Sequence, residues 1–194
     1  MIHRQALRPI EVLLVEDSPS DANLTIKGFS NAQIANNLHW VEDGESAMNY
    51  LREQEEFTRI SHKFEMQRGR GAEGIELGTL NSPLLPCSPA QAQALSIGEK
   101  SGFTNVPRPD LILLDLNLPG MDGREVLTEI KSDPNLKSIP VVIITTSTDD
   151  QDILRSYNLS ANCYVTKPID VYQFIQVVQL LKDFWLIAAT LPQK

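Results

Sequence analysis

Mostly apolar runs of four to six residues recur along this chain, and segments with a helical spacing of apolar residues separate them. The first run, at residues 10–15 (IEVLLV), is nearly continuously apolar and ends at Glu16 and Asp17. This pattern is typical of a parallel strand that is buried on both faces. Further strands are predicted at residues 38–41, 111–114, 139–144 and 163–166.

Helices are predicted between these strands from their start signals and their apolar stripes. Ser18 has the character of an N-cap, with Pro19 in the first helical position and Asp21 as its capping-box partner. Further helices are predicted at residues 45–51, 123–131, 150–157 and 171–182. Five strands that alternate with helices predict an α/β fold, a doubly wound, flavodoxin-like, five-stranded parallel sheet with strand order 2-1-3-4-5.

Residues 56–108 do not fit this alternation. Asp17 and Asp115 are 98 positions apart, whereas the elements predicted between them need only about 45 residues. The surplus contains six of the ten glycines and a Pro- and Ser-rich patch at residues 82–89. Because such a segment buries little apolar surface, we expect a flexible surface insertion with at most a short helix, over residues 90–97.

Composition and charge narrow the class of protein. The net charge of −8 argues against nucleic acid or an anionic membrane as the main partner. The two cysteines, Cys87 and Cys163, do not form the framework of a disulfide-rich protein. No signal peptide or run of 18 apolar residues is present, so a cytoplasmic protein that does not span a membrane is expected.

Polar residues follow the carboxyl ends of four of the predicted strands. They are Glu16 and Asp17, then Asp115, Thr145 and Lys167. In a 2-1-3-4-5 sheet these four strands are consecutive neighbours, so the side chains are expected in one crevice at the carboxyl edge. Any one of them is equally well explained as an ordinary polar residue that ends a strand. Their convergence is not explained in that way.

The residue types in this crevice point to phosphoryl chemistry. Three carboxylates repel one another unless a cation lies among them, and Mg²⁺ is the cation that carboxylate oxygens suit best. Lys167 adds a second positive charge and Thr145 a hydroxyl donor. Together they form a receptor for a phosphoryl group, with Asp115 as a nucleophile of the aspartyl-phosphate type.

At this point the chain resembles a known family. The segments VLLVEDSPSD, PDLILLDLNLPGMDG, PVVIITTS and ANCYVTKP are similar to the receiver domains of two-component response regulators, over about residues 8–183 without the insertion. More narrowly, DLNLPGMDGREVLTEIK, SYNLSANCYVTKPIDVYQFIQVV and DFWLIAATLP resemble the single-domain regulators that partner phytochrome-type histidine kinases. The resemblance implies a cytoplasmic signalling protein with a sensor histidine kinase as one partner and a downstream protein as another.

The resemblance also assigns roles residue by residue. Glu16 and Asp17 match the acidic pair that holds Mg²⁺, and Asp115 matches the phosphoacceptor. Asn117 matches the position that offers a backbone carbonyl to the metal, so the implied metal set is Glu16, Asp17, Asp115 and Asn117.

Three more residues match the family's switch. Thr145 corresponds to the switch hydroxyl, Lys167 to the phosphate-contacting lysine, and Tyr164 to the aromatic that moves inward when the hydroxyl is recruited. Taken alone, Tyr164 reads as an ordinary core aromatic. The Lys167–Pro168 bond matches a peptide bond that is usually cis in the family.

The main alternative is an enzyme, a magnesium-dependent phosphotransferase or phosphatase that forms an aspartyl phosphate. That class places a second Asp two residues after the nucleophile as the general acid, and the chain has Asn117 there. The sequence therefore favours a regulator that is not an enzyme. Only twelve residues follow Lys182, which is too few for a DNA-binding output domain, so the output is expected to be protein–protein.

The end of the chain is unusually apolar. The last predicted helix carries a stripe that includes Phe174, and residues 184–194 continue as an apolar C-terminal extension that begins with Phe184 and Trp185. This is more apolar surface than one sheet face covers, and exposed patches of this kind mark interfaces. We expect a homodimer with Phe174, Phe184 and Trp185 in its interface. The alternative is an extension that folds back on its own domain.

Overall fold

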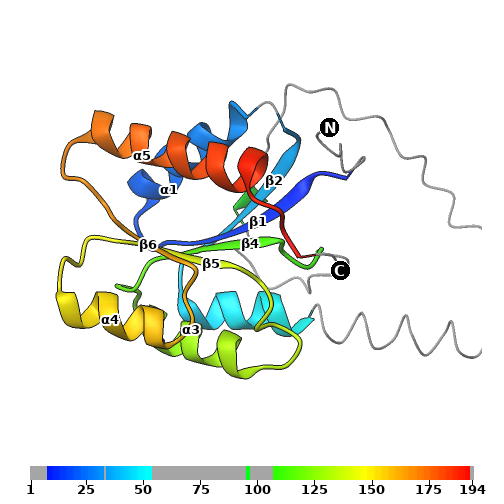
Figure 1. Ribbon diagram of the computed structural model, residues 1–194, viewed down its shortest axis with the longest axis vertical. Coiled ribbons are helices and arrows are strands. Elements are labelled where there is room, and N and C mark those ends of the chain that lie inside the picture. Colours follow the sequence, from blue (N-terminus) through cyan, green and yellow to red (C-terminus); the bar gives the residue numbers. More distant parts are fainter. Residues whose placement is uncertain (1–7, 33, 54–94, 97–106, 193–194) are drawn as a thin grey trace, which may run out of the picture.

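A single parallel sheet with helices on both faces forms the computed structural model, which describes residues 8–32, 34–53, 95–96 and 107–192 (Figure 1). Its strands are β1 (Ile10–Val15), β2 (Asn36–Val41), β3 (Leu95–Ser96), β4 (Leu111–Leu114), β5 (Val141–Thr145) and β6 (Cys163–Thr166). All neighbouring strands pair in parallel, in the order β3-β2-β1-β4-β5-β6. The five predicted strands therefore have the predicted 2-1-3-4-5 order, and the two-residue β3 extends the edge beyond β2.

The strand register brings the ends of the strands level. Val15 lies beside Leu114, and Thr145 lies beside Thr166. Because parallel strands all end at the same edge, the residues that follow them emerge together at the carboxyl edge. This register is what positions the polar residues described below.

The helices are α1 (Pro19–Ser30), a helix over residues 44–53, α3 (Gly123–Ser132), α4 (Asp150–Asn158) and α5 (Val171–Asp183), which continues into a π-helical turn, η1 (Phe184–Ala188). The Ser18 side chain caps α1 by accepting a hydrogen bond from the Asp21 amide, as predicted. Among the helices of the described chain, none combines the length and apolar character needed to cross a lipid bilayer.

The side chains of alternate strand residues pack into two apolar cores, one on each face of the sheet. Leu13 and Val15 of β1 face the helix over residues 44–53 and α3, whereas Val12 and Leu14 face α1 and α5 (Figure 1). Both cores are almost fully buried. This explains why the strands are continuously apolar in sequence, since each face of the sheet is covered.

Helix α4 contributes little to either core. Of its nine residues Ser156 alone is buried, whereas the apolar Leu154 and Tyr157 are 63% and 51% exposed. The position of α4 therefore depends less on apolar packing than that of α3 or α5.

The C-terminal extension folds back on its own domain, so the expected set of dimer anchors needs correction. Phe174 and Trp185 are buried in the core beneath α1 and α5, together with Leu186. The π-helical turn directs Trp185 and Leu186 inward, so two of the three anchors are used within the chain. Phe184 remains 55% exposed, beside the Trp185 ring.

Most of the predicted insertion lies outside the described residues. Its described parts are Leu95–Ser96, which pairs with His39 and Trp40 of β2, and residues 107–108. The short helix considered over residues 90–97 is not formed at Leu95–Ser96, because this segment pairs with the edge strand β2 as a strand.

The last two residues of the expected insertion contact the domain. The Tyr50 hydroxyl donates to the Pro107 carbonyl at 3.2 Å, and the Arg108 guanidinium donates to Ser138 Oγ at 3.2 Å. The remaining boundaries of the insertion, and its flexibility, stay predictions.

We predict that residues 56–106 are dispensable for folding. A short Gly-Ser linker in their place should lower Tm by no more than about 5 °C, because the two-residue β3 is the one element described within this range and closure entropy grows slowly with loop length. A matched variant that retains Leu95 and Ser96 isolates the contribution of β3. Thermal unfolding measures both, and a linker variant that precipitates or unfolds would show that the segment packs on the domain.

Candidate functional site

Three carboxylates meet at the carboxyl edge of β1 and β4. Glu16, Asp17 and Asp115 each offer an oxygen, and these oxygens lie within 4.8 Å of one another. Glu16 and Asp115 are buried, at 2% and 4% exposure, and Asp17 is exposed. Burying two carboxylates side by side is costly unless positive charge accompanies them.

Lys167 supplies part of that charge from the end of β6. Its Nζ lies 2.6 Å from Glu16 Oε2 and 2.6 Å from Asp115 Oδ2. Burial by itself lowers the pKa of Lys167, but the hydrogen bonds to Asp115 and Glu16 outweigh this effect and raise the pKa above its ordinary value. The side chain is therefore an ammonium held against the Asp115 carboxylate.

A fourth carboxylate, Asp21, also reaches this lysine. Asp21 Oδ2 lies 3.1 Å from Lys167 Nζ, from the first turn of α1. From the sequence, Asp21 was predicted only as a helix-capping residue, and this contact was not predicted. Its position in the first turn of the helix that directly follows β1 is the signal that places it near the carboxyl edge of the sheet.

The carboxylate set fits a divalent metal. Burial raises the pKa of Glu16 to about 7, although the ion pair with Lys167 opposes the rise. One lysine thus leaves the carboxylates short of positive charge, and hard oxygen donors in this number suit a hard divalent cation. The residues that would hold it are Glu16, Asp17 and Asp115.

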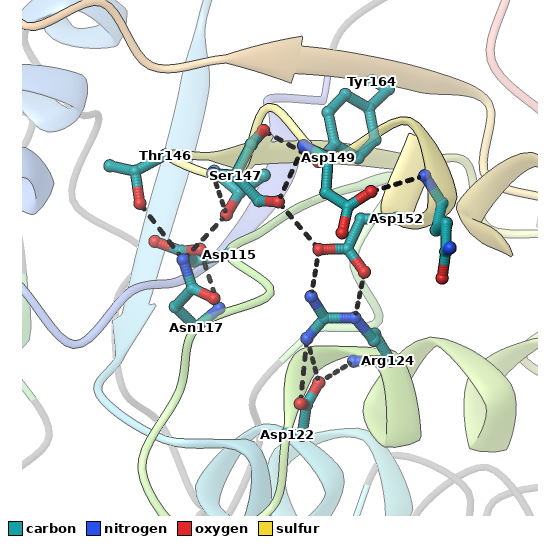
Figure 2. Close-up of polar contacts among 11 residues, drawn as sticks. Asp115, Asn117, Asp122, Arg124, Thr146, Ser147, Asp149, Asp152 and Tyr164 are labelled. Carbon is teal, nitrogen blue, oxygen red and sulfur yellow. Dashed lines mark hydrogen bonds and ion pairs between the residues drawn. The ribbon is translucent and has the colours of Figure 1, made fainter. Parts of the chain in front are cut away.

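Thr145 is the last residue of β5 and is completely buried. Its Oγ1 accepts hydrogen bonds from Asn117 Nδ2 at 3.3 Å and from the Ser147 amide at 3.4 Å. Asn117 in turn donates its backbone amide to Asp115 Oδ1 at 2.9 Å and Nδ2 to Thr146 Oγ1 at 3.1 Å (Figure 2). Asn117 therefore ties the Asp115 loop to the end of β5.

Tyr164 contacts the loop after β5 rather than the carboxylates. Its hydroxyl donates to the Ser147 carbonyl at 3.0 Å, and its partly buried ring packs against the core that contains α3 (Figure 2). The structure thus connects Tyr164 to Thr145 through a single residue, Ser147. The inward movement implied by the family resemblance stays a prediction.

The expected cis peptide bond is wrong for this structure. No peptide bond in the described ranges is cis, so Lys167–Pro168 is trans, the form that an X-Pro bond favours by about 0.5–1 kcal/mol. The trans bond leaves the Lys167 ammonium in contact with Asp115.

Glycine is required where α3 begins behind Asp115. The Gly123 amide donates to the Leu116 carbonyl at 3.1 Å. A Cβ at Gly123 would lie 2.1 Å from the Asp115 carbonyl oxygen, a distance at which the backbone would have to move. The start of α3 is therefore fixed directly against the strand end that carries Asp115.

Comparisons with known proteins agree with this geometry. Residues 92–179 match the family described as the response regulator receiver domain. The response regulator Rcp1 of Synechocystis sp. is 36% identical over 184 residues, which cover 95% of this chain and 94% of that protein.

Two solved structures are similar over nearly the whole chain. The phosphorylated cyanobacterial phytochrome response regulator RcpA has a TM-score of 0.69 at 36% identity and covers 96% of this chain and 100% of its own. The Mn²⁺-bound form of Rcp1 has the same TM-score and identity, with 95% and 100% covered.

Proposed function

Because this chain belongs to the response regulator receiver domain family, and is thus a two-component response regulator, we propose that it accepts a phosphoryl group from a sensor histidine kinase onto Asp115. The observation that carries the assignment is the buried Asp115 carboxylate, held 2.6 Å from the Lys167 ammonium within an acidic cluster. Phosphorylation of Asp115 then changes which proteins the chain binds.

The proposed transfer uses groups already in place. An Asp115 carboxylate oxygen attacks the phosphorus, a P–O bond forms, and the bond from phosphorus to the donor histidine nitrogen breaks with its electron pair left on nitrogen. Lys167 lies where it offsets the charge of the phosphoryl oxygens. Mg²⁺, held by Glu16, Asp17, Asp115 and the Asn117 carbonyl, would offset the remaining charge.

The proposed partners follow from the relatives and from the charge. RcpA is described as a phytochrome response regulator, which supports a phytochrome-type histidine kinase as the donor. The net charge of −8 favours a protein rather than a nucleic acid or a membrane as the downstream partner. We place the protein in the cytoplasm, where such kinases present their phosphohistidine.

The chain is proposed to signal and not to act as a phosphatase or phosphotransferase enzyme. A hydrolase of the aspartyl-phosphate class needs a general acid two residues after the nucleophile, and the Asn117 amide cannot act as a general acid. The Asn117 amide is engaged with Thr145 and Thr146. These contacts suit a positioning role.

Two copies of the chain are proposed to pair through an apolar stripe at its C-terminal end. Leu180, Phe184 and Ile187 are 71%, 55% and 58% exposed and lie four and three residues apart. Leu180 and Phe184, four residues apart at the end of α5, share one side of that helix, and Ile187 is exposed in the π-helical turn that follows. A two-fold pair buries such a stripe against itself, and the family resemblance to phytochrome-partnered regulators supports this location.

We predict that Phe184→Asp shifts the dimer to monomer at tens of micromolar protein. A buried charge opposite its own copy in a two-fold interface costs several kcal/mol, whereas Phe184 is exposed in the single chain and its replacement should leave the fold intact. Light scattering, with and without phosphorylation, gives the mass. Leu154→Asp on α4, where Leu154 is 63% exposed, is the matched control. A monomeric wild type in both states, or dissociation by Leu154→Asp alone, would contradict the assignment.

A further inference from the structure

A network of charged and polar side chains links α3 to the loop that carries the switch hydroxyl. The Arg124 guanidinium on α3 donates from Nε to Asp152 Oδ1 at 3.0 Å and from Nη2 to Asp152 Oδ2 at 2.5 Å. Asp152, in the first turn of α4, accepts from Ser147 Oγ at 2.7 Å (Figure 2). We call Arg124, Asp152 and Ser147 the α3–α4 bridge.

One end of this bridge is fixed to the acceptor strand. Arg124 also contacts its own N-cap, with Nη1 2.9 Å from Asp122 Oδ2. Asp122 closes a capping box with Glu125, and the next residue, Gly123, lies against the Asp115 carbonyl. Through these contacts the position of Arg124 is fixed relative to the end of β4.

The other end is the β5–α4 loop, which leads into a helix with little apolar packing. Helix α4 buries Ser156 alone, so its first turn depends on the bridge for its position. Arg124 first, and Ser147 with it, hold the pKa of Asp152 below its ordinary value, so the carboxylate is ionised at neutral pH. Charge-assisted hydrogen bonds of this kind are roughly twice as strong as neutral ones.

Ser147 is the residue where the bridge meets the proposed switch. Its amide donates to Thr145 Oγ1 at 3.4 Å, its carbonyl accepts from the Tyr164 hydroxyl at 3.0 Å, and its Oγ also accepts from the Asp149 amide at 3.3 Å. If Thr145 turns toward a phosphoryl group on Asp115 and keeps this amide contact, Ser147 moves with it. The bond to Asp152 opposes that movement, because Arg124 holds Asp152 in place.

We propose that Arg124 and Asp152 are positioning residues of the phosphorylation switch, which hold Ser147, and through it Thr145 and Tyr164, in the arrangement of the unphosphorylated protein. The inference rests on the proposed role of Thr145. The Ser147–Asp152 hydrogen bond is the contact given up on activation, so it stabilises one state and not the other. Only such a differential contact shifts a two-state equilibrium.

The test uses beryllium fluoride with saturating Mg²⁺ as a mimic of the phosphoryl group on Asp115. Trp40, whose indole donates to the Glu16 carbonyl at 2.8 Å, reports occupancy of the acidic cluster by its fluorescence. A ligand that selects the active state binds with an apparent affinity that rises with the population of that state. Ser147→Ala, and separately Asp152→Asn, should therefore lower the half-saturating concentration about three- to tenfold, the factor that corresponds to about 0.7–1.4 kcal/mol.

The matched control is Arg52→Met. Arg52 pairs with Glu129 of α3 at 2.5 Å, on the surface and away from the β5–α4 loop, so its loss should leave the half-saturating concentration unchanged. A variant that merely loosens the fold would bind the mimic no more tightly than wild type. Tighter binding is therefore a readout that general destabilisation does not produce.

Two outcomes would overturn the inference alone. One is a wild type that responds while either Ser147→Ala or Asp152→Asn is unchanged or weaker. The other is an Arg52→Met variant that tightens binding as much as Ser147→Ala. A wild type with no response would instead overturn the proposed function of Asp115, and the inference with it.

Discussion

Replacing Asp115 by Asn is expected to abolish phosphorylation of the protein by acetyl phosphate. The carboxylate oxygen is the nucleophile, and an amide at the same position keeps the shape but cannot form the acyl phosphate. Asp115 is buried, and its Oδ2 lies 2.6 Å from the Lys167 ammonium, the group that offsets charge on an incoming phosphoryl group. Mass measurement of the intact protein after incubation with acetyl phosphate and Mg²⁺ gives the extent of labelling.

The same experiment tests the metal. EDTA should prevent labelling of the wild type, since the carboxylate cluster is short of positive charge and an incoming phosphoryl group adds more negative charge. Asp149→Asn is the matched control: Asp149 caps α4, and Asn caps a helix equally well. Labelling of Asp115→Asn, or full labelling of the wild type in EDTA, would rule out the assignment.

The gathering of the site at one edge of the sheet was predictable from sequence because it depends on backbone topology alone. Once the strand order is 2-1-3-4-5, the residues after β1, β4 and β6 emerge together whatever their side chains do. The ion pair of Lys167 with Asp115, which are 52 positions apart, follows from that order. The proximity of the carboxylates and the lysine could therefore be predicted without knowing their side-chain rotamers.

Contacts that depend on side-chain direction were not predictable in this way. Arg124 and Asp152 are 28 residues apart on different helices, and nothing in their spacing pairs them. The inward course of Trp185 depends on the π-helical turn that follows α5, and a regular helical spacing does not reveal such a turn. The sequence therefore indicated the chemistry of the site and left open how the switch is connected to α4.

Thr145→Ala is expected to separate phosphorylation from its consequences. The variant should still accept phosphate, because the contacts of Asp115 with Lys167 and the Asn117 amide do not involve Thr145. It should lose the proposed hydrogen bond from the Thr145 hydroxyl to the phosphoryl group, through which phosphorylation would move the β5–α4 loop. A hydrogen bond to a charged group contributes about 1.5–3 kcal/mol. The phosphorylation-dependent change in partner binding or oligomeric state should therefore fall by a factor of about 10 to 100.

Two variants at neighbouring positions make the result specific to this hydroxyl. Thr145→Ser keeps the hydroxyl and should retain most of the response, whereas Thr146→Ala removes an exposed hydroxyl one residue further on and should change it little. Light scattering before and after acetyl phosphate, with intact mass to confirm equal labelling, compares the three proteins. Because Thr145 is completely buried, its loss also creates a small cavity, and an unfolding curve shows whether the variant remains folded during the assay. If folded, fully phosphorylated Thr145→Ala responds like wild type, the switch lies elsewhere, and the Ser147 amide, which contacts the Thr145 hydroxyl, is not part of it.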